Sequence, residues 1–256
     1  MSSSEPAARH VLVTGATRGI GRAIAAAFVA AGDRVTVLGR TPRSAAAAAE
    51  ALGPTATSVA ADVTDAAALT AALAAAADAS GPIDVLVSNA GGADTAPLAR
   101  MSVDALRAMM ALNVEPLLVA AQAVVPAMKA RGGGRIITIA STAGLKGYAY
   151  VGAYCAAKHA AVGLTRALAQ ELARSGVTVN AVCPGFTDTD LVAGSLDALE
   201  AKTGRDRADL LAEFTKVNPM GRLITPDEVA AACLWLASPA AGAVTGQAIA
   251  VAGGEL

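Results

Sequence analysis

Residues 11–22 read VLVTGATRGIGR, an apolar run that passes directly into a glycine-rich turn. The run Val11–Val13 is typical of a buried strand, and the glycines follow where a helix would begin. Glycine permits a tight turn and lets a pyrophosphate approach the backbone N–H groups at the positive end of a helix. The spacing is GxxxGxG rather than GxGxxG, so a plain strand–helix turn is the alternative. Its position at the first junction of the chain favours a nucleotide-binding loop made of Gly15, Thr17, Arg18, Gly19, Ile20 and Gly21.

Six further strand-like apolar runs follow, and longer stretches of helical character separate them. The runs are 34–38, 57–60, 83–87, 135–139, 177–182 and 248–251. Short, continuous apolar strands are typical of a parallel sheet that helices cover on both faces. The sequence therefore predicts an α/β fold, a single-domain, Rossmann-like, doubly wound parallel sheet of about seven strands. We expect residues 1–8 to form a flexible N-terminus and residues 9–256 to form the domain.

Composition excludes several classes of protein. The 256 residues suffice for one domain with a sizeable core, and a net charge of −1 offers no footprint for nucleic acid. No run of about 18 apolar residues is free of polar interruption, and Met1–Pro6 lacks the features of a secretory signal. We therefore expect a cytoplasmic protein without a membrane partner. Three scattered cysteines (155, 183 and 233) and two histidines predict neither a disulfide framework nor a metal site.

The end of the second predicted strand indicates which nicotinamide cofactor such a loop would bind. A site for NAD usually places an acid there, about 20 residues past the glycines, to hold the ribose 2′-OH. Residues 37–43 read VLGRTPR, and Asp33 lies at the wrong end of the strand. Arg40 is a natural partner for a 2′-phosphate, and Arg18 could add a second positive charge. We predict that NADP(H) is preferred over NAD(H), and we interpret Arg43 as an ordinary solvated helix residue.

Three other strand ends carry candidate cofactor contacts. After the third strand, Asp62 could accept from an adenine amino group while Val63 packs on the ring. A helix N-cap is an equally good interpretation of Asp62, with Thr64 and Asp65 as competing caps. Small residues after the fourth strand allow a cofactor to pass close to the backbone, and those after the sixth could hydrogen-bond a carboxamide. The candidates at these two ends are Asn89, Ala90, Gly91, Pro184, Gly185, Thr187 and Thr189.

Tyr154 and Lys158 stand four residues apart in a stretch of helical character, which places them on one face, one turn apart. A neighbouring ammonium favours the phenolate, so we expect Lys158 to lower the pKa of Tyr154 and make it a usable proton donor. Neither of the other two tyrosines has a lysine at this spacing. Taken alone, the pair reads more readily as a buried aromatic beside a surface lysine.

Residues 190–222 are richer in charge than the rest of the chain and follow the sixth strand. In an open α/β sheet the ligand lies beyond the carboxyl ends of the strands, so this segment is well placed to act as a substrate lid. A solvated pair of surface helices is an equally good interpretation.

Together these motifs resemble the short-chain dehydrogenases/reductases. The motifs, in the order seen in that family, are TGATRGIG, SNAG, Asn113, Ser141, Tyr154-x3-Lys158 and Cys183-Pro184-Gly185. The resemblance runs from about residue 9 to the C-terminus, and the chain looks most like bacterial 3-oxoacyl-thioester reductases and related ketoreductases. Ser88 stands where many members have a second asparagine.

The resemblance implies a role for each of these residues. Tyr154 would exchange a proton with the substrate oxygen, and Lys158 would lower its pKa and hold the nicotinamide ribose. Ser141 would position the substrate oxygen, and its spacing to Tyr154 favours it over Thr142. Asn113 would hold a water in a proton relay to Lys158, although by itself it reads as a satisfied core amide. Hydride transfer belongs to the cofactor.

The implied reaction interconverts a ketone and a secondary alcohol, with a 3-oxoacyl thioester of acyl-carrier protein or coenzyme A as the expected substrate. Basic side chains could meet the phosphates of such a carrier. They are Lys202, Arg205, Arg207, Lys216, Arg131 and Arg135. One alternative is a polyketide, steroid or cyclic substrate, recognised by residues 143–151. Another is a catalytically silent nucleotide sensor, which the presence of Tyr154 and Lys158 disfavours.

Family members are commonly homotetramers or dimers. The apolar segment 229–251 suits burial between subunits, although it could equally cover the sheet within one subunit.

Overall fold

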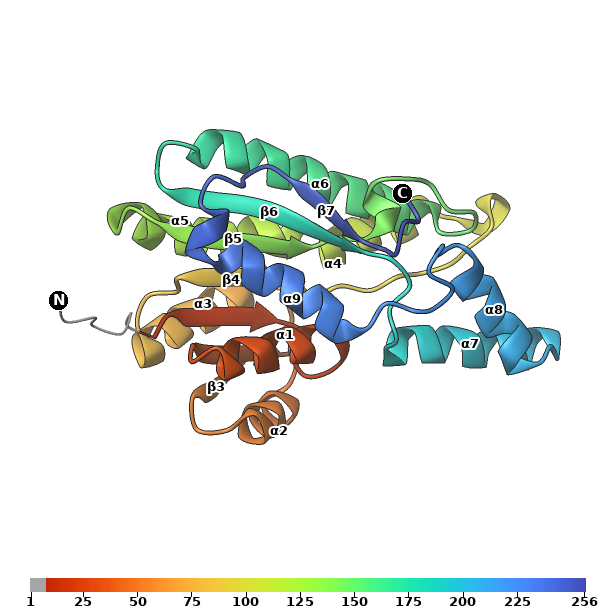
Figure 1. Ribbon diagram of the computed structural model, residues 1–256, viewed down its shortest axis with the longest axis horizontal. Helices are drawn as coiled ribbons and strands as arrows, with labels where there is room; N and C mark the ends of the chain where they lie inside the picture. Colours follow the sequence, from red (N-terminus) through yellow and green to blue (C-terminus); the bar gives the residue numbers. More distant parts are fainter. Residues whose placement is uncertain (1–7) are drawn as a thin grey trace.

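Seven parallel strands form one sheet in the computed structural model, which describes residues 8–256 (Figure 1). They are β1 (His10–Thr14), β2 (Arg34–Gly39), β3 (Ala56–Ala60), β4 (Val85–Ser88), β5 (Gly134–Ile139), β6 (Val177–Pro184) and β7 (Ala248–Val251). Their order is β3-β2-β1-β4-β5-β6-β7, and every neighbouring pair is parallel. The predicted doubly wound sheet is therefore confirmed. Of residues 1–8, which we expected to form a flexible N-terminus, residues 1–7 lie outside the described residues.

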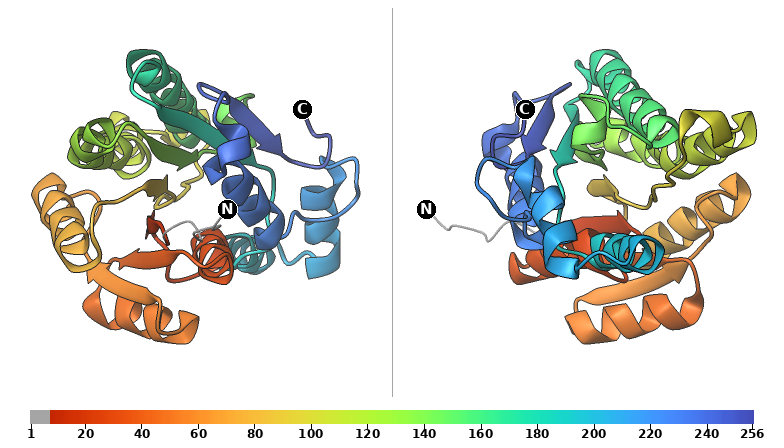
Figure 2. Two further views of the ribbon diagram at one scale, coloured as in Figure 1. Left: turned by 60° about the vertical axis from the view of Figure 1, so that its left-hand side comes forward. Right: turned by 90° about the vertical axis from the view of Figure 1, so that its right-hand side faces the viewer.

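Nine α-helices lie in the described part of the chain. They are α1 (Gly19–Ala30), α2 (Pro42–Leu52), α3 (Ala66–Ser80), α4 (Val103–Asn113), α5 (Glu115–Ala130), α6 (Gly152–Leu172), α7 (Asp190–Thr203), α8 (Arg207–Lys216) and α9 (Pro226–Ala237). One face of the sheet is covered by α1, α2 and α9, and the other by α3, α5 and α6 (Figure 2).

The centre of the sheet explains why the strands are continuously apolar. Val11 and Val13 on β1 pack with α1 and α9, whereas Leu12 between them packs with α3 and α5 on the opposite face. All three side chains are fully buried, because successive side chains of a strand point to opposite faces and both faces are covered. Each such burial stabilises the fold by roughly 1.5–3 kcal/mol.

One segment of the described chain, Val103–Ala130, is long and apolar enough to cross a membrane by length and composition. It comprises α4 and α5, which are separated at Val114. Part of its apolar surface belongs to the core, because Leu117, Val124 and Met128 of α5 are buried against the sheet.

Candidate functional site

The glycine loop lies at the carboxyl end of β1 and packs tightly against the segment that follows β4. Gly15 has a φ of +64°, and a Cβ placed there would come 2.9 Å from the Cα of Ala90. A Cβ on Gly21 would come 2.4 Å from both the side-chain nitrogen of Asn89 and the carbonyl oxygen of Gly15. No side chain fits at either position, so the loop and α1 approach this segment at backbone distance.

Thr14, the last residue of β1, joins these two segments. Its hydroxyl accepts from the backbone N–H groups of Asn89 and Ala90, each at 2.9 Å. The Asn89 amide donates in return to the carbonyls of Thr14 (2.9 Å) and Gly15 (3.1 Å). Thr14 was not among the predicted site residues, and its only signal in the sequence is a hydroxyl immediately before the first glycine. Asn89 acts here by holding the loop.

The N-terminus of α1 is open. Arg18 stands at its N-cap without a side-chain hydrogen bond, whereas Asp65 caps α3 by accepting from two backbone N–H groups. The first N–H groups of α1 thus remain available at the positive end of the helix dipole, which is how helices bind phosphate. A Cβ on Gly19 would lie 3.4 Å from the Thr189 methyl group, so the start of α7 borders the same loop. The donors and the space therefore fit a dinucleotide pyrophosphate.

Arg40 and Asp62 follow β2 and β3, which are paired at Gly39 and Ala60, and both side chains are exposed. The Asp62 carboxylate accepts from the backbone N–H of Thr64 at 2.9 Å and from its hydroxyl at 2.7 Å. These two bonds hold the pKa of Asp62 below its usual value, with a smaller contribution from Arg40. The N-cap interpretation of Asp62 is wrong, because Asp65 caps α3. Val63 is half-buried and packs on the core below α3.

Lys158 is the buried cation of the site. Only 5% of the residue is exposed, and its Nζ donates to the Ile139 carbonyl at the end of β5 at 3.0 Å. Burial lowers the pKa of Lys158 to about 8. The same Nζ lies 5.6 Å from the centre of the Tyr154 ring, so the two side chains share one face of α6 as predicted.

The expected direction of the Tyr154 pKa is wrong for this chain. Burial raises the pKa of Tyr154, and a hydrogen bond with the Ser141 side chain opposes that rise. The Lys158 Nζ lies 5.6 Å from the ring centre and donates to the Ile139 carbonyl, and burial sets the direction of the Tyr154 pKa. Tyr154 is consequently held as a phenol.

Ser141 and Thr142 follow β5 and enter the 3₁₀ turn η2 (Thr142–Gly144). The Ser141 hydroxyl accepts from the backbone N–H of Ala143 at 3.1 Å and remains half-buried near Tyr154. Thr142 is buried, and its hydroxyl lies 2.6 Å from the Tyr148 hydroxyl. The structure thus brings Ser141, rather than Thr142, to the phenol of Tyr154.

Asn113 ends α4 and is buried beside Lys158. Its amide nitrogen donates to the carbonyls of Gly92 and Met109, each at 3.0 Å, and its oxygen accepts from the Gly92 N–H at 3.3 Å. A Cβ on Gly91 would lie 2.6 Å from this oxygen and 3.4 Å from Lys158 Nζ. Asn113 is therefore a satisfied amide that fixes the 91–92 turn next to the buried cation.

The segment after β6 completes the site. Pro184 ends the strand, and the Thr187 hydroxyl donates to the Gly185 carbonyl at 3.0 Å. Thr187 is buried and forms a parallel bridge with Ile224, while the Thr189 hydroxyl donates to the Thr187 carbonyl at 3.3 Å. The segment is thus a hydrogen-bonded turn that borders both the glycine loop and the end of β6.

The structure divides the predicted carrier contacts into two groups. Arg131 and Arg135 lie at the amino end of β5, opposite the site, and Arg131 pairs with Asp84 at 3.1 Å. The carrier contact predicted for them is wrong, because they lie at the amino end of β5 and the site lies at the carboxyl ends of the strands. In α8 and the turn before it, Arg205 pairs with Glu213, and Arg207 pairs with acids of α7. These pairs are exposed and contribute little to stability.

The helices α7 and α8 stand out at one side of the molecule and share a small apolar core (Figure 1). Its buried members are Val192, Leu196 and Leu210. Phe186, just after β6, packs edge-on against Phe214 of α8 with the ring centres 4.7 Å apart. This contact attaches the helical pair to the strand end that borders the site.

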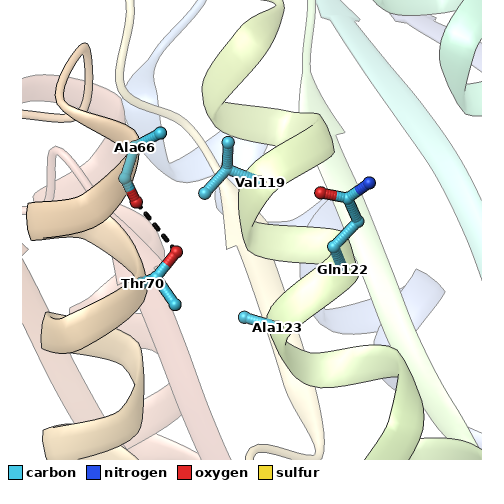
Figure 3. Close-up of a pocket in the computed structure, with 5 residues that line it drawn as sticks. All are labelled: Ala66, Thr70, Val119, Gln122 and Ala123. Atoms are coloured by element: carbon cyan, nitrogen blue, oxygen red, sulfur yellow. Dashed lines mark hydrogen bonds between the residues drawn. The ribbon is translucent and has the colours of Figure 1, made fainter.

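Two surface hollows differ in their relation to these residues. One lies between α3 and α5 and is lined by uncharged side chains (Figure 3). In the other, apolar and aromatic side chains stand at the start of α6, whose first residue, Gly152, precedes Tyr154 by two positions. Its lining is Ala96, Leu98, Met101, Tyr148, Tyr150 and Gly152.

The described residues contain no group of three or more His, Cys, Asp or Glu side chains placed to hold a metal ion.

Comparison with known proteins agrees with this arrangement. The family model "short chain dehydrogenase" matches residues 9–200. A sorbitol dehydrogenase of Cereibacter sphaeroides is 38% identical, with 96% of this chain and 97% of that protein aligned. The 3-oxoacyl-acyl-carrier-protein reductase FabG of Vibrio harveyi is 40% identical, with 95% of each chain aligned.

A solved structure extends the likeness to three dimensions. The crystal structure of a single-substitution variant of actinorhodin polyketide ketoreductase with NADPH matches with a TM-score of 0.92 at 36% identity, covering 97% of both chains. The chain therefore belongs to the short-chain dehydrogenase family and is an NAD(P)-dependent oxidoreductase that acts on CH–OH groups.

Proposed function

We propose that this protein interconverts a ketone and a secondary alcohol with NADP(H), with Tyr154 as the group that exchanges a proton with the substrate oxygen. The observation that carries the proposal is the meeting of Ser141, Tyr154 and Lys158 at the carboxyl ends of β5 and β6, beside the open N-terminus of α1. Ligands of open α/β sheets bind at this edge.

The residues that would hold the cofactor fall into three groups. The glycine loop, with Gly15, Thr17, Arg18, Gly19, Ile20 and Gly21, would hold the pyrophosphate. Asp62, Val63, Asn89, Ala90 and Gly91 would border the adenosine and the ribose. Lys158, Tyr154, Pro184, Gly185, Thr187 and Thr189 would surround the nicotinamide, which supplies or accepts the hydride when bound.

The chain's own residues handle the proton and the oxygen. A phenol whose pKa is raised by burial stays protonated near neutral pH, so Tyr154 is ready to donate during reduction. Ser141 holds a second hydroxyl next to it and would orient the carbonyl oxygen. Lys158, half-charged near pH 8, sits where it would stabilise the phenolate that remains. Asn113 would support a water-mediated path from Lys158 to solvent.

The preference for NADP(H) rests on Arg40. Its exposed guanidinium follows β2 directly, at the position where NAD-selective sites carry an acid. A guanidinium pairs with a phosphate through two parallel hydrogen bonds, so it would favour the 2′-phosphate over a 2′-hydroxyl.

For the substrate we propose a 3-oxoacyl thioester of acyl-carrier protein or coenzyme A. Relatives with this name and with ketoacyl reductase names support the class. The hollow at the start of α6 is lined by Leu98, Met101 and two tyrosines, which suits an acyl chain better than a sugar alcohol. The segment 190–222, which contains α7 and α8, would close over the bound substrate as a lid. Reduction of a polyketide or cyclic ketone is the second candidate, favoured by the same aromatic lining.

A substrate panel separates these possibilities. The absorbance of NADPH would be followed with acetoacetyl-CoA, with a bicyclic ketone and with fructose, and Tyr154→Phe would serve as the reference variant. We expect acetoacetyl-CoA to react fastest and Tyr154→Phe to lose about 10²–10⁴-fold in kcat while it still binds NADPH. Faster turnover of the bicyclic ketone would reassign the substrate. Full activity of Tyr154→Phe would remove Tyr154 as the proton donor.

We further propose a homodimer or homotetramer. Val103 and Leu118, on α4 and α5, and Trp235 on α9 are exposed, although most other apolar residues of α9 pack within the subunit. Light scattering after size exclusion tests this, and a monomer mass at micromolar concentration would contradict it.

A further inference from the structure

Glu255, the penultimate residue, reaches back to the loop that follows Ser141. Its side chain is 1% exposed, and one carboxylate oxygen, Oε1, accepts from Lys146 Nζ at 3.0 Å. The same oxygen accepts from the Tyr148 hydroxyl, 107 residues away in sequence. The backbone carbonyl of Glu255 accepts from Lys146 as well, at 3.3 Å. The end of the chain is therefore fastened to residues 142–152, which we call the substrate loop.

Tyr148 relays this contact toward the site. Its hydroxyl lies 2.6 Å from Thr142 Oγ1, next to Ser141, and its ring packs edge-on against Phe186 with the ring centres 6.2 Å apart. Burial and the bond to Glu255 raise the pKa of Tyr148 far above its ordinary value, so its hydroxyl remains a donor. The ring also lines the hollow at the start of α6.

The second carboxylate oxygen of Glu255 lies at the other strand end. Oε2 is buried without a hydrogen-bond partner among residues 8–256, and a Cβ on Gly185 would come 3.0 Å from it. The carboxylate thus stands between the turn after β5 and the turn after β6. A buried oxygen without a hydrogen-bond partner lowers the stability of the fold. The position of the Glu255 carboxylate is therefore not explained by stabilisation of the C-terminus alone.

The substrate loop needs such an anchor. Tyr150 has a φ of +68°, a conformation that is strained for a non-glycine residue, and its side chain is 69% exposed. Its carbonyl accepts from the Ala96 N–H at 2.8 Å, which joins the loop to the opposite wall of the hollow. Strained backbone persists only where its surroundings hold it, and Glu255 supplies two of the holding contacts.

We propose that Glu255 is a positioning residue that sets the substrate pocket: through Tyr148 and Lys146 it holds the substrate loop in the form that admits the ketone. The proposal rests on the proposed ketoreductase function. Without the carboxylate, Tyr148 is released from its place in the wall of the hollow. Ketone binding then weakens, whereas NADPH binding is kept, because the hydrogen bonds of the carboxylate go to the substrate loop and none goes to Gly185.

The test compares Glu255→Gln, which keeps the shape but not the charge, with Glu255→Ala. Asp104→Asn removes an acid of an exposed ion pair on α4 and serves as the control. We expect KM for acetoacetyl-CoA to rise about tenfold or more in Glu255→Ala, the scale of one lost charged hydrogen bond, with the NADPH affinity kept. Glu255→Gln should show a smaller rise in the same direction, and Asp104→Asn none. In the Tyr148→Phe background the effect of Glu255→Gln should shrink to the part that acts through Lys146, because the contact with the Tyr148 hydroxyl is already lost.

A second measurement does not need activity. Amide hydrogen exchange of residues 142–152 should speed up about tenfold in Glu255→Ala and stay unchanged in Asp104→Asn. Unchanged exchange would overturn the proposal, as would equal losses of NADPH and ketone binding with a lower melting temperature. If wild type reduces no ketone, the proposed function fails, and the exchange experiment still decides whether Glu255 holds the loop.

Discussion

Lys158 stands one helical turn from Tyr154, with its Nζ 5.6 Å from the centre of the tyrosine ring and bonded to the Ile139 carbonyl. The cation thereby faces both the end of β5 and the phenol. Burial lowers the pKa of Lys158 to about 8 and raises the pKa of Tyr154, so a protonated phenol lies beside a lysine whose pKa is depressed.

The depressed pKa of Lys158 predicts how stability depends on pH. Below about pH 8 the lysine is charged in the folded and the unfolded chain, so the cost of burying the charge is fully present. Between about pH 8 and the ordinary range of lysine near ~10.4, the folded chain has lost the proton and the unfolded chain keeps it, so stability rises with pH.

We therefore expect the free energy of unfolding of wild type to rise relative to that of Lys158→Met by up to about 3 kcal/mol between pH 8 and 10. Denaturant unfolding at several pH values measures this difference. Lys129→Met, at an exposed position of α5, is the control and should follow wild type. Parallel curves for wild type and Lys158→Met would show that the buried lysine does not titrate in this range.

Arg40→Ser should change the choice of cofactor. Loss of a charge-assisted contact to the 2′-phosphate should raise KM for NADPH about 10- to 100-fold and leave KM for NADH nearly unchanged. Steady-state kinetics with both cofactors and one ketone gives the ratio. Arg43→Ser, three residues further on the exposed face of α2, is the matched control. An unchanged ratio in Arg40→Ser would mean that another residue reads the phosphate.

Ser141→Ala and Thr142→Ala should have different effects, although the residues are neighbours. Ser141 acts on the Tyr154 phenol, so its loss should reduce kcat by about 10²-fold, the scale of one donor lost from a charge-stabilising site. Thr142 is buried against Tyr148, so its loss should reduce stability by roughly 1–2 kcal/mol with a smaller effect on kcat. Kinetics and thermal unfolding of both variants separate the roles. A larger fall in kcat for Thr142→Ala would reverse them.

Much of the fold follows from the sequence because its strands are short and continuously apolar. Buried parallel strands such as β1 and β6 leave little choice of environment, so the pattern alone predicts them. The fourth strand differs at its start: residues 83 and 84 precede β4, where Asp84 accepts from the His10 N–H and pairs with Arg131. An apolar pattern does not reveal that polar contacts of Asp84 take the place of strand pairing before Val85.

The site was predictable where one motif carries the chemistry and not where distant segments meet. The Tyr154–Lys158 spacing fixes their common helix face, but the direction of the Tyr154 pKa depends on burial, which spacing does not contain. Arg131 and Arg135 look close to the site in sequence, yet a parallel strand separates its two ends by its full length. Glu255 was missed because its partners are more than a hundred residues away.

Gly91→Ala should disturb catalysis by displacing Asn113 or Lys158, which both lie against Gly91. A Cβ at this position would lie 2.6 Å from the Asn113 side-chain oxygen and 3.4 Å from Lys158 Nζ, so at least one of these groups must move. We expect a loss of about 1–3 kcal/mol in stability, the usual cost of overpacking. We also expect a fall of about tenfold or more in kcat, because a small misplacement of catalytic groups is costly. Gly163→Ala on α6, where a Cβ meets nothing within 4 Å, is the control and should be neutral or stabilising. If Gly91→Ala matches Gly163→Ala in both kcat and stability, the turn at 91–92 accommodates a methyl group and does not determine the position of Lys158.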